Sequence, residues 1–146
     1  MPIRSYTLCS NEQAAEPIKK LFDFLRTKPG SAVTSELTLA EVLPKPKVPD
    51  HRRAYFELIV WSGMFDLRPV SRQILTETAA YRKISAIERP DGTSSMVKLP
   101  DAIHVVTAIR AGCTHVLSKD RLRVPKEIQL IRPDDQSISR LLAEFA

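Results

Sequence analysis

The chain has 146 residues, of which 43% are hydrophobic and 27% charged, with a formal net charge of +5. This length suits one domain over residues 1–146, and the composition excludes a disordered chain. No apolar run reaches the roughly 20 residues that span a membrane, and the N-terminus lacks the apolar core of a signal peptide, so we expect a cytoplasmic protein without membrane contact. The excess of Lys and Arg favours a polyanionic partner, although many basic proteins bind no nucleic acid.

Hydrophobic periodicity predicts alternating strands and helices in the first half of the chain. We expect a short edge strand, an amphipathic helix, a buried strand and a short helix, over residues 3–8, 14–25, 32–34 and 37–43. The short helix ends at Pro44, because the residue before a proline is disfavoured in the α conformation. A basic, proline-rich connector then leads to an aromatic-rich helix over residues 51–62.

The second half continues the same alternation. We expect a strand, a helix, a polar loop, a second helix, two strands and a terminal helix, over residues 65–70, 72–87, 88–98, 100–111, 114–117, 129–132 and 138–145. Strands that alternate with helices predict an α/β fold with a mostly parallel sheet, covered by helices on both faces.

Three acidic residues lie where one predicted element gives way to the next. Glu41 is in the short helix before Pro44, Asp101 opens the helix after Pro100, and Asp120 follows a predicted strand. Ligand sites of open α/β sheets lie beyond the carboxyl ends of the strands, so these carboxylates are expected to meet there. Carboxylates that gather repel one another unless a hard divalent cation lies between them. The pattern therefore predicts Mg²⁺-assisted chemistry on a phosphate.

Each acid also has a purely structural interpretation. Thr38 and Glu41 have the spacing of a capping box, in which the Glu accepts from the backbone of the first residue. Asp101 is suited to the N-terminal end of any helix, and Asp120 to the turn after any strand. His104 is three residues after Asp101, and we expect it to be a core or capping histidine without a catalytic role, because Mg²⁺ prefers oxygen ligands.

Basic side chains form two sets in the sequence, one beside Asp120 and one beside the proline-rich connector. Lys119, Arg121 and Arg123 flank Asp120 and are predicted to bind RNA, whereas a solvated surface is the alternative. A second set flanks the proline-rich connector and comprises Lys45, Lys47, Arg52 and Arg53. The chain has neither a phosphate-binding glycine loop nor a serine nucleophile elbow.

Taken together, the segments Ser35–Leu43, Leu99–Ala111 and Val116–Arg121 resemble the PIN-domain ribonucleases, and within them the VapC-like toxins of toxin–antitoxin pairs. The resemblance implies a PIN-like three-layer α/β/α sandwich and a Mg²⁺- or Mn²⁺-dependent endoribonuclease. Glu41, Asp101 and Asp120 would then be its catalytic metal ligands. It further implies a cognate antitoxin protein and a homodimer. Tyr55, Phe56, Leu58, Ile59 and Trp61 make the helix over residues 51–62 the expected dimer surface.

The N-terminus departs from the family pattern. Family members open with a strand that ends in D-T-N or D-S-N, whose Asp is a metal ligand, whereas this chain has no Asp before Asp23. Aligning Thr7–Asn11 with that strand end places Cys9 where the Asp belongs. A divergent first dozen residues, or a misplaced gene start, are the alternatives. The competing functional hypothesis is a catalytically impaired PIN-like domain that binds RNA or an antitoxin.

Overall fold

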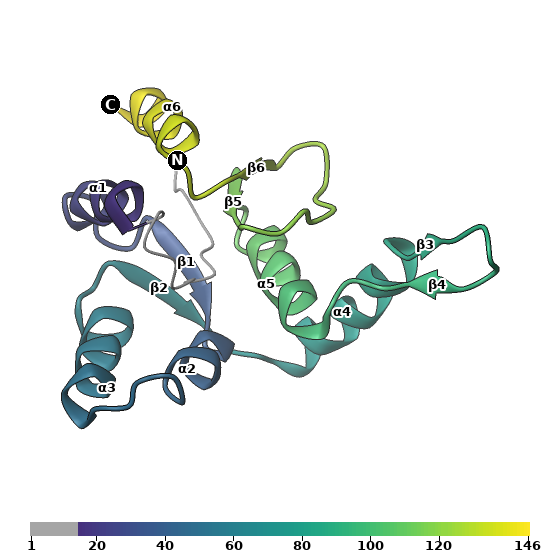
Figure 1. Ribbon diagram of the computed structural model, residues 1–146, viewed down its shortest axis with the longest axis horizontal. Helices are drawn as coiled ribbons and strands as arrows, with labels where there is room; N and C mark the ends of the chain where they lie inside the picture. Colours follow the sequence, from purple (N-terminus) through teal and green to yellow (C-terminus); the bar gives the residue numbers. More distant parts are fainter. Residues whose placement is uncertain (1–14) are drawn as a thin grey trace.

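The structure is a computed structural model that describes residues 15–146 (Figure 1). The edge strand expected over residues 3–8 lies outside the described residues. In the first half, the elements follow the expected order: α1 (Ala15–Arg26), β1 (Ala32–Ser35), α2 (Leu37–Val42), α3 (Pro49–Phe56), the π-helical turn η2 (Glu57–Trp61) and β2 (Phe65–Arg68). The predicted helix over residues 51–62 is therefore an α-helix that widens into a π-helical turn.

The second half holds two short strands that the sequence did not predict. The elements are α4 (Arg72–Ile84), β3 (Ile87–Glu88), β4 (Ser94–Ser95), α5 (Leu99–Arg110), β5 (His115–Leu117), β6 (Gln129–Ile131) and α6 (Asp135–Phe145). The expected polar loop contains an antiparallel hairpin, β3–β4, so that prediction was wrong. Asp91 closes its turn by accepting the backbone N–H of Thr93 at 2.9 Å, and Gly92 adopts a φ of 81°.

The strands of the core pair in parallel, as predicted. β1 pairs with β2 in a register that sets Ala32 against Phe65, and β5 pairs with β6 in a register that sets His115 against Gln129. Among the described residues these are two separate parallel pairs. One strand of each pair, β1 and β5, is buried along its whole length.

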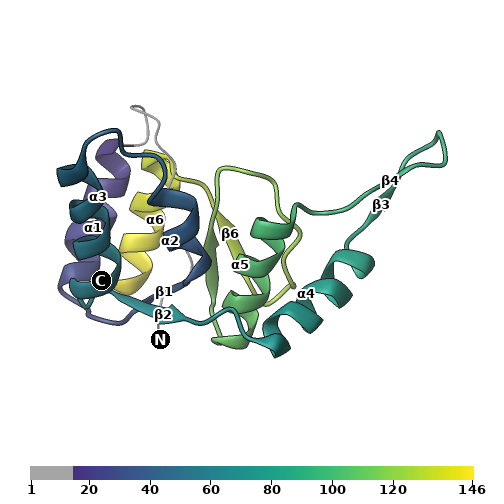
Figure 2. The ribbon, with the colours of Figure 1, turned by 90° about the horizontal axis from the view of Figure 1, so that it is seen from below.

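The strands lie between helical layers, with α6 on one side of β5 and α5 on the other (Figure 2). Alternate residues of a strand point to opposite faces. Ala32 of β1 and Leu117 of β5 pack with α1 and α6 in one core cluster. Val33 and Val116, their neighbours along the same strands, pack with Ala108 of α5 and with Cys113 in a second cluster. The strands therefore lie between α1 and α6 on one face and α5 on the other, which confirms the predicted α/β/α layering.

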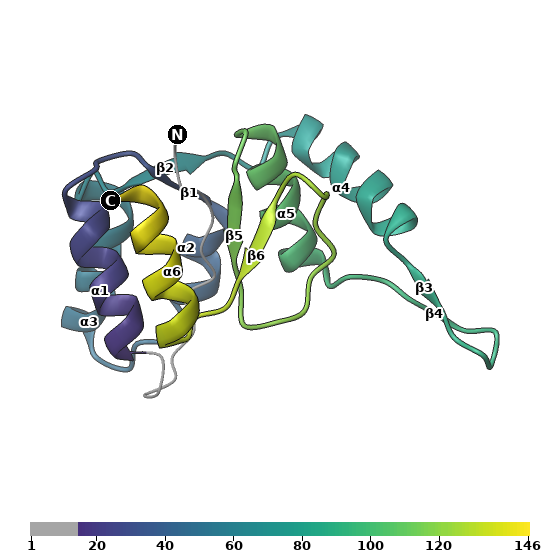
Figure 3. The ribbon, with the colours of Figure 1, turned by 90° about the horizontal axis from the view of Figure 1, so that it is seen from above.

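Helix α5 is the most enclosed helix of the described chain. Every residue of Ala102–Ala108 is buried, so no face of this segment meets water. One face packs on the strands and another on α4, through Ile74, Ile103 and Val106. The β3–β4 hairpin extends away from the end of α4 as an arm (Figure 3). Within residues 15–146, no helix combines the length and apolar character needed to cross a bilayer.

Candidate functional site

Two of the three predicted acids lie in one pocket. Asp101 and Asp120 both line a pocket of about 320 Å³, which is within the usual range for ligand sites. The pocket is bounded by the arm, by the start of α5 and by the segment after β5. Its lining comprises Ser85, Ile87, Ser95, Met96, Val97, Lys98, Asp101, Asp120, Arg121, Leu122 and Arg123.

Asp101 is placed by the first turn of α5. Lys98, in extended conformation, precedes the helix, Pro100 occupies its first turn, and Asp101 follows where the helix dipole stabilises a negative charge. Burial raises the pKa of the Asp101 carboxyl, and the negative charge of Asp120 raises it further. The positive charge of Lys98 acts in the opposite direction. A carboxyl that is half-buried beside another carboxyl is an arrangement that proteins concentrate at functional sites.

Asp120 is placed by the turn that follows β5. The hydroxyl of Ser118 accepts the backbone N–H of Asp120 at 3.1 Å, and the N–H of Ser118 donates to the Ile131 carbonyl at 3.0 Å. Ser118 is buried, whereas Asp120 is exposed. The serine therefore fixes the turn that presents Asp120 beyond the carboxyl end of the strand.

Glu41 contacts a buried histidine. Nε2 of His104 lies 2.7 Å from Oε2 of Glu41, and the His104 side chain is only 2% exposed. Because a carboxylate can only accept, the imidazole donates from Nε2. Nδ1 of His104 has no hydrogen-bond partner among the described residues. The contact joins α2 to α5 and fixes one oxygen of Glu41.

Two sequence interpretations change with this contact. Glu41 does not close a capping box, because its carboxylate bonds to His104 and the hydroxyl of Thr38 pairs with that of Thr34 at 2.7 Å. His104 is a core residue, as predicted, but it also contacts a candidate acid. Glu41 therefore bonds to His104, 63 positions away along the chain, and not to the backbone at the start of its own helix.

Basic side chains form a rim around the acidic pocket. Arg121 and Arg123, two of the predicted RNA-binding residues, line the pocket with Lys98. Lys119 is exposed but is not part of the lining. The hydroxyl of Tyr81, on α4, donates to the backbone carbonyl of Arg123 and so ties this segment to the helical layer.

The donor set fits a divalent cation in its chemistry. Asp101 and Asp120 supply hard oxygen atoms in one pocket, and the charges of Asp120 and Glu41 both raise the pKa of Asp101. A cation between these groups would relieve that repulsion. Within residues 15–146, no group of three or more His, Cys, Asp or Glu side chains is close enough to hold a metal ion. Cys9, the residue aligned with the missing Asp, lies outside the described residues.

Sequence reasoning missed much of the pocket wall. Ile87, Met96 and Val97 come from the arm and its connection to α5. These residue types carry no signal of a binding role, and only the fold brings them to the acids. Lys98 offered a signal, because a cation three residues before Asp101 is close to the start of the same helix.

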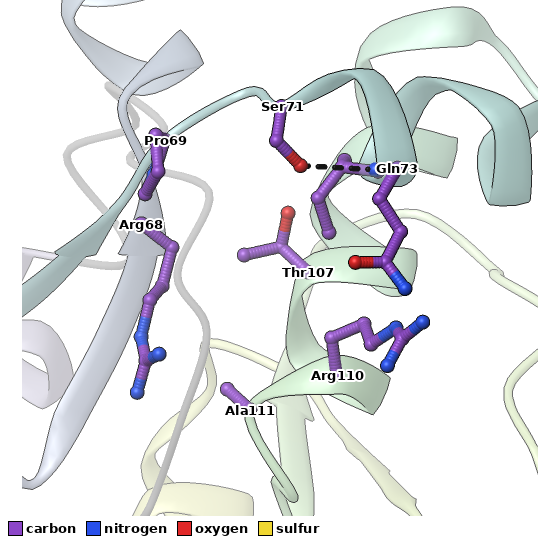
Figure 4. Close-up of a pocket in the computed structure, with 8 residues that line it drawn as sticks. Arg68, Pro69, Ser71, Gln73, Thr107, Arg110 and Ala111 are labelled. Atoms are coloured by element: carbon purple, nitrogen blue, oxygen red, sulfur yellow. Dashed lines mark hydrogen bonds between the residues drawn. The ribbon is translucent and has the colours of Figure 1, made fainter.

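A second cavity, of about 240 Å³, lies near the other end of α5 (Figure 4). Arg110 lines it and forms a forked ion pair with Glu77. Arg68 also lines it and pairs with Asp66 at 2.7 Å. No carboxylate lines this cavity and both arginines are already paired, so the acidic pocket is the better candidate site.

The chain shows clear similarity to known proteins in sequence and fold. A family model described as "PIN domain" matches residues 4–122, and no curated protein matches the chain. Its fold resembles a chain of VapBC2 from Rickettsia felis, solved with a DNA fragment from their promoter (TM-score 0.56, 13% identity, 80% of this chain and 85% of that chain covered). It also resembles a chain of FitAB bound to an IR36 DNA fragment (TM-score 0.56, 14% identity, 91% and 95% covered). Because the family model spans most of its length, the chain belongs to the PIN domain family.

Proposed function

We propose that this protein is a metal-dependent endoribonuclease of the VapC-like toxin type. The observation that carries the proposal is the convergence of Asp101 and Asp120 in one pocket whose rim includes Lys98, Arg121 and Arg123. Carboxylates suit a metal ion, and the cationic rim suits the phosphates of RNA. The resemblance of the sequence motifs to VapC-like toxins supports the same activity.

In this proposal, Asp101 and Asp120 bind Mg²⁺ or Mn²⁺ in the pocket they share, and Glu41 is the further ligand that the sequence resemblance implies. When bound, such an ion lowers the pKa of its water and offsets the charge that develops at the scissile phosphate. His104 holds the Glu41 carboxylate in position through its Nε2–H, and the cations of the rim bind the phosphates that flank the cleaved bond.

Cleavage of single-stranded RNA tests the proposal. The purified chain is incubated with an end-labelled oligonucleotide in Mg²⁺, in Mn²⁺ or in a chelator, and the products are resolved by length. We expect cleavage only with metal ion, and its loss in Asp101→Asn. Asp23→Asn is the matched control, because Asp23 pairs with Arg26 on the exposed surface of α1. Metal-independent cleavage, or full activity of Asp101→Asn, would contradict the proposal.

Cys9 extends the same test to the N-terminus. A thiol is a soft and mostly protonated group that binds Mg²⁺ poorly, whereas a carboxylate adds a hard ligand. We expect Cys9→Asp to lower the Mg²⁺ concentration needed for half-maximal cleavage, and Asp120→Asn to cancel the gain. If Cys9→Asp changes nothing while the wild-type chain cleaves efficiently, Cys9 does not occupy the position of the missing Asp. If neither chain cleaves yet both bind RNA, the impaired binding domain is the correct alternative.

We also propose the partners that the sequence resemblance implies: a cognate antitoxin protein and a second copy of this chain, in the cytoplasm. Two similar folds, VapBC2 and FitAB, come from structures solved with DNA fragments, which supports the antitoxin partner. Co-expression with the adjacent open reading frame, followed by co-purification, tests the antitoxin.

A further inference from the structure

A groove outside the acidic pocket combines aromatic and cationic side chains. It has a volume of about 400 Å³ and lies among the end of α2, α3 and the turn η2. Trp61 is 66% exposed and is packed edge-on by the ring of Phe56, with the two centroids 4.9 Å apart. The lining comprises Leu43, Pro49, Arg52, Arg53, Phe56 and Trp61.

The π-helical turn η2 explains why Trp61 is exposed. Ile59, in the middle of this turn, is buried, and Leu58 packs on the cluster formed by α1 and α6. Because a π-helical turn holds more residues than an α-helical one, Trp61 is displaced from the inward-facing side. Such turns are rare and occur frequently at functional sites.

The cations of the groove are largely free of acidic partners. No carboxylate lines the groove, and within residues 15–146 Arg52 makes no ion pair. Arg53 pairs with Glu57 at 2.9 Å on the exposed surface, where such pairs are weak. Exposed Lys45 and Lys47 precede α3 on the adjoining connector. An occupant with negative charge is therefore favoured.

We propose that this groove binds single-stranded RNA, with one base stacked on Trp61 and the neighbouring phosphates on Arg52 and the connector lysines. Unpaired bases present free ring faces, and stacking on an aromatic side chain combined with cations is the usual mode of single-strand binding. The concave shape suits an inserted base better than it suits a flat protein surface. In a two-fold contact with a second copy, Arg52 and Arg53 would face the same two arginines of that copy, and the like charges would repel one another.

The location of the groove links it to the candidate site. Leu43, at one end of the groove, lies two residues beyond Glu41, at the end of the same helix. The groove therefore adjoins the helix that carries Glu41, one of the three candidate acids. The identity of the ligand rests on the proposed ribonuclease function, whereas the groove and its charge do not depend on it.

The fluorescence of Trp61 reports binding directly, because it is the only tryptophan in the chain. A single-stranded oligonucleotide is titrated into the full chain in a chelator, so that cleavage does not interfere. We expect saturable quenching, and weaker quenching with a duplex of the same sequence, whose bases are already stacked. Asp101→Asn should retain the quenching, because Asp101 does not line the groove.

Two variants separate the stacking contact from the phosphate contacts. With labelled RNA and anisotropy detection, Trp61→Ala should weaken binding roughly tenfold and leave the salt dependence unchanged. Arg52→Ala should reduce the slope of log affinity against log salt by about 0.7, the value for one phosphate contact with a single strand. Arg140→Ala, which removes an exposed arginine from α6, is the matched control and should have neither effect. Circular dichroism verifies the fold of each variant.

Failure of this inference is distinguishable from failure of the proposed function. Cleavage without quenching of Trp61 fluorescence would contradict RNA binding in the groove and would still support the proposed ribonuclease activity. Quenching without metal-dependent cleavage would support RNA binding in the groove and would contradict the proposed ribonuclease activity. Equal effects of Arg52→Ala and Arg140→Ala, or burial of Trp61 by self-association without RNA, also overturn the inference.

Discussion

Under the proposed function, Asp101 is a residue at which function opposes stability. Its carboxyl has a raised pKa because of burial and of the negative charge of Asp120, so the folded chain holds the Asp101 proton more tightly than the unfolded chain. Stability therefore falls as the pH rises from the unfolded value of about 3.9 through the raised folded value. Above the folded value the full loss is present.

Replacing Asp101 by Asn should accordingly stabilise the metal-free protein at neutral pH. We expect a rise of roughly 2 °C in melting temperature, kept small because the carboxyl is only partly buried and solvent screens it. Thermal melts in a chelator should show this difference shrinking as the pH is lowered towards about 4. A variant that melts below the wild-type chain at neutral pH would contradict the assigned repulsion.

In the proposed site His104 acts through Glu41, and variants that keep or remove the donor at the position of Nε2 test this positioning role. The amide of His104→Gln can donate near the position of Nε2, whereas His104→Leu fills the buried site without a donor. If Glu41 is a metal ligand, loss of its partner should cost roughly 10–100-fold in metal affinity or cleavage rate. We expect His104→Gln to retain most activity and His104→Leu to need more Mn²⁺ for half-maximal rate, with KM for RNA unchanged. Equal behaviour of the two variants would assign His104 to packing alone.

Among the secondary-structure elements, the arm does the most to shape the site. Ile87 and Met96 line the acidic pocket, and Nε of Arg82 holds the arm to α4 by donating to the Val97 carbonyl at 2.8 Å. The arm contributes little to the core, since its strands are short and mostly exposed. It can therefore change substrate binding without changing stability.

Truncating Met96 should separate these two properties. Met96→Ala should raise KM for RNA severalfold, with less than about 0.5 kcal/mol change in the free energy of unfolding, because Met96 is 52% exposed. Leu75→Ala is the matched control: Leu75 is 47% exposed on α4 and does not line the pocket. Steady-state kinetics and urea unfolding provide the two measurements. A KM that responds equally to both variants would show that the arm wall does not contact RNA.

The sequence predicted elements wherever periodicity and end signals agreed. Gly30 after α1, Pro44 after α2 and Gly112 after α5 mark ends that the structure confirms. The β3–β4 hairpin was missed because its strands contain two residues each and Ser94–Ser95 carries no hydrophobic alternation. The turn η2 was missed because a π-helical turn leaves no distinct spacing in so short a segment.

The candidate site was predictable in part for a similar reason. Asp101 and Asp120 are fixed by local signals, a helix start and a strand end, and the topology brings them to one pocket. The partner of Glu41 and the arm wall depend on contacts between distant segments, which no local pattern encodes. Placing Cys9 depends on a comparison with the family, because the thiol itself is uninformative.

At the scale of the whole molecule, the expected dimer surface changes. Ile59 is buried and Leu58 packs on the protein's own core, so the helix before β2 offers less apolar surface than the sequence indicated. Exposed large hydrophobic residues instead gather where α4 meets the arm and the arm meets α5. These are Ile84, Ile87, Met96 and Leu99. Exposed apolar groups of this kind commonly mark protein contacts.

We therefore expect a dimer that depends on this junction. Light scattering at micromolar concentration should give the mass of two chains, and Ile84→Lys should shift it to one, because Ile84 is 82% exposed and its loss leaves the core intact. Ile109→Lys, at a 40% exposed position of α5, is the control and should remain dimeric. A wild-type monomer would exclude this mode of self-association.

The enclosure of α5 has a consequence for how the protein is made. The chain emerges from the ribosome N-terminus first, and α5 is covered partly by Val116 and Ile128, which follow it. The helix that carries Asp101 therefore stays without its full cover until β5 and the segment before β6 have been synthesised. Asp120 follows β5 and is also synthesised after the helix that carries Asp101. Under the proposed function, a pocket able to cut RNA is thus assembled only after Ile128 has been synthesised, which limits the exposure of the translating ribosome's own RNA to the emerging chain.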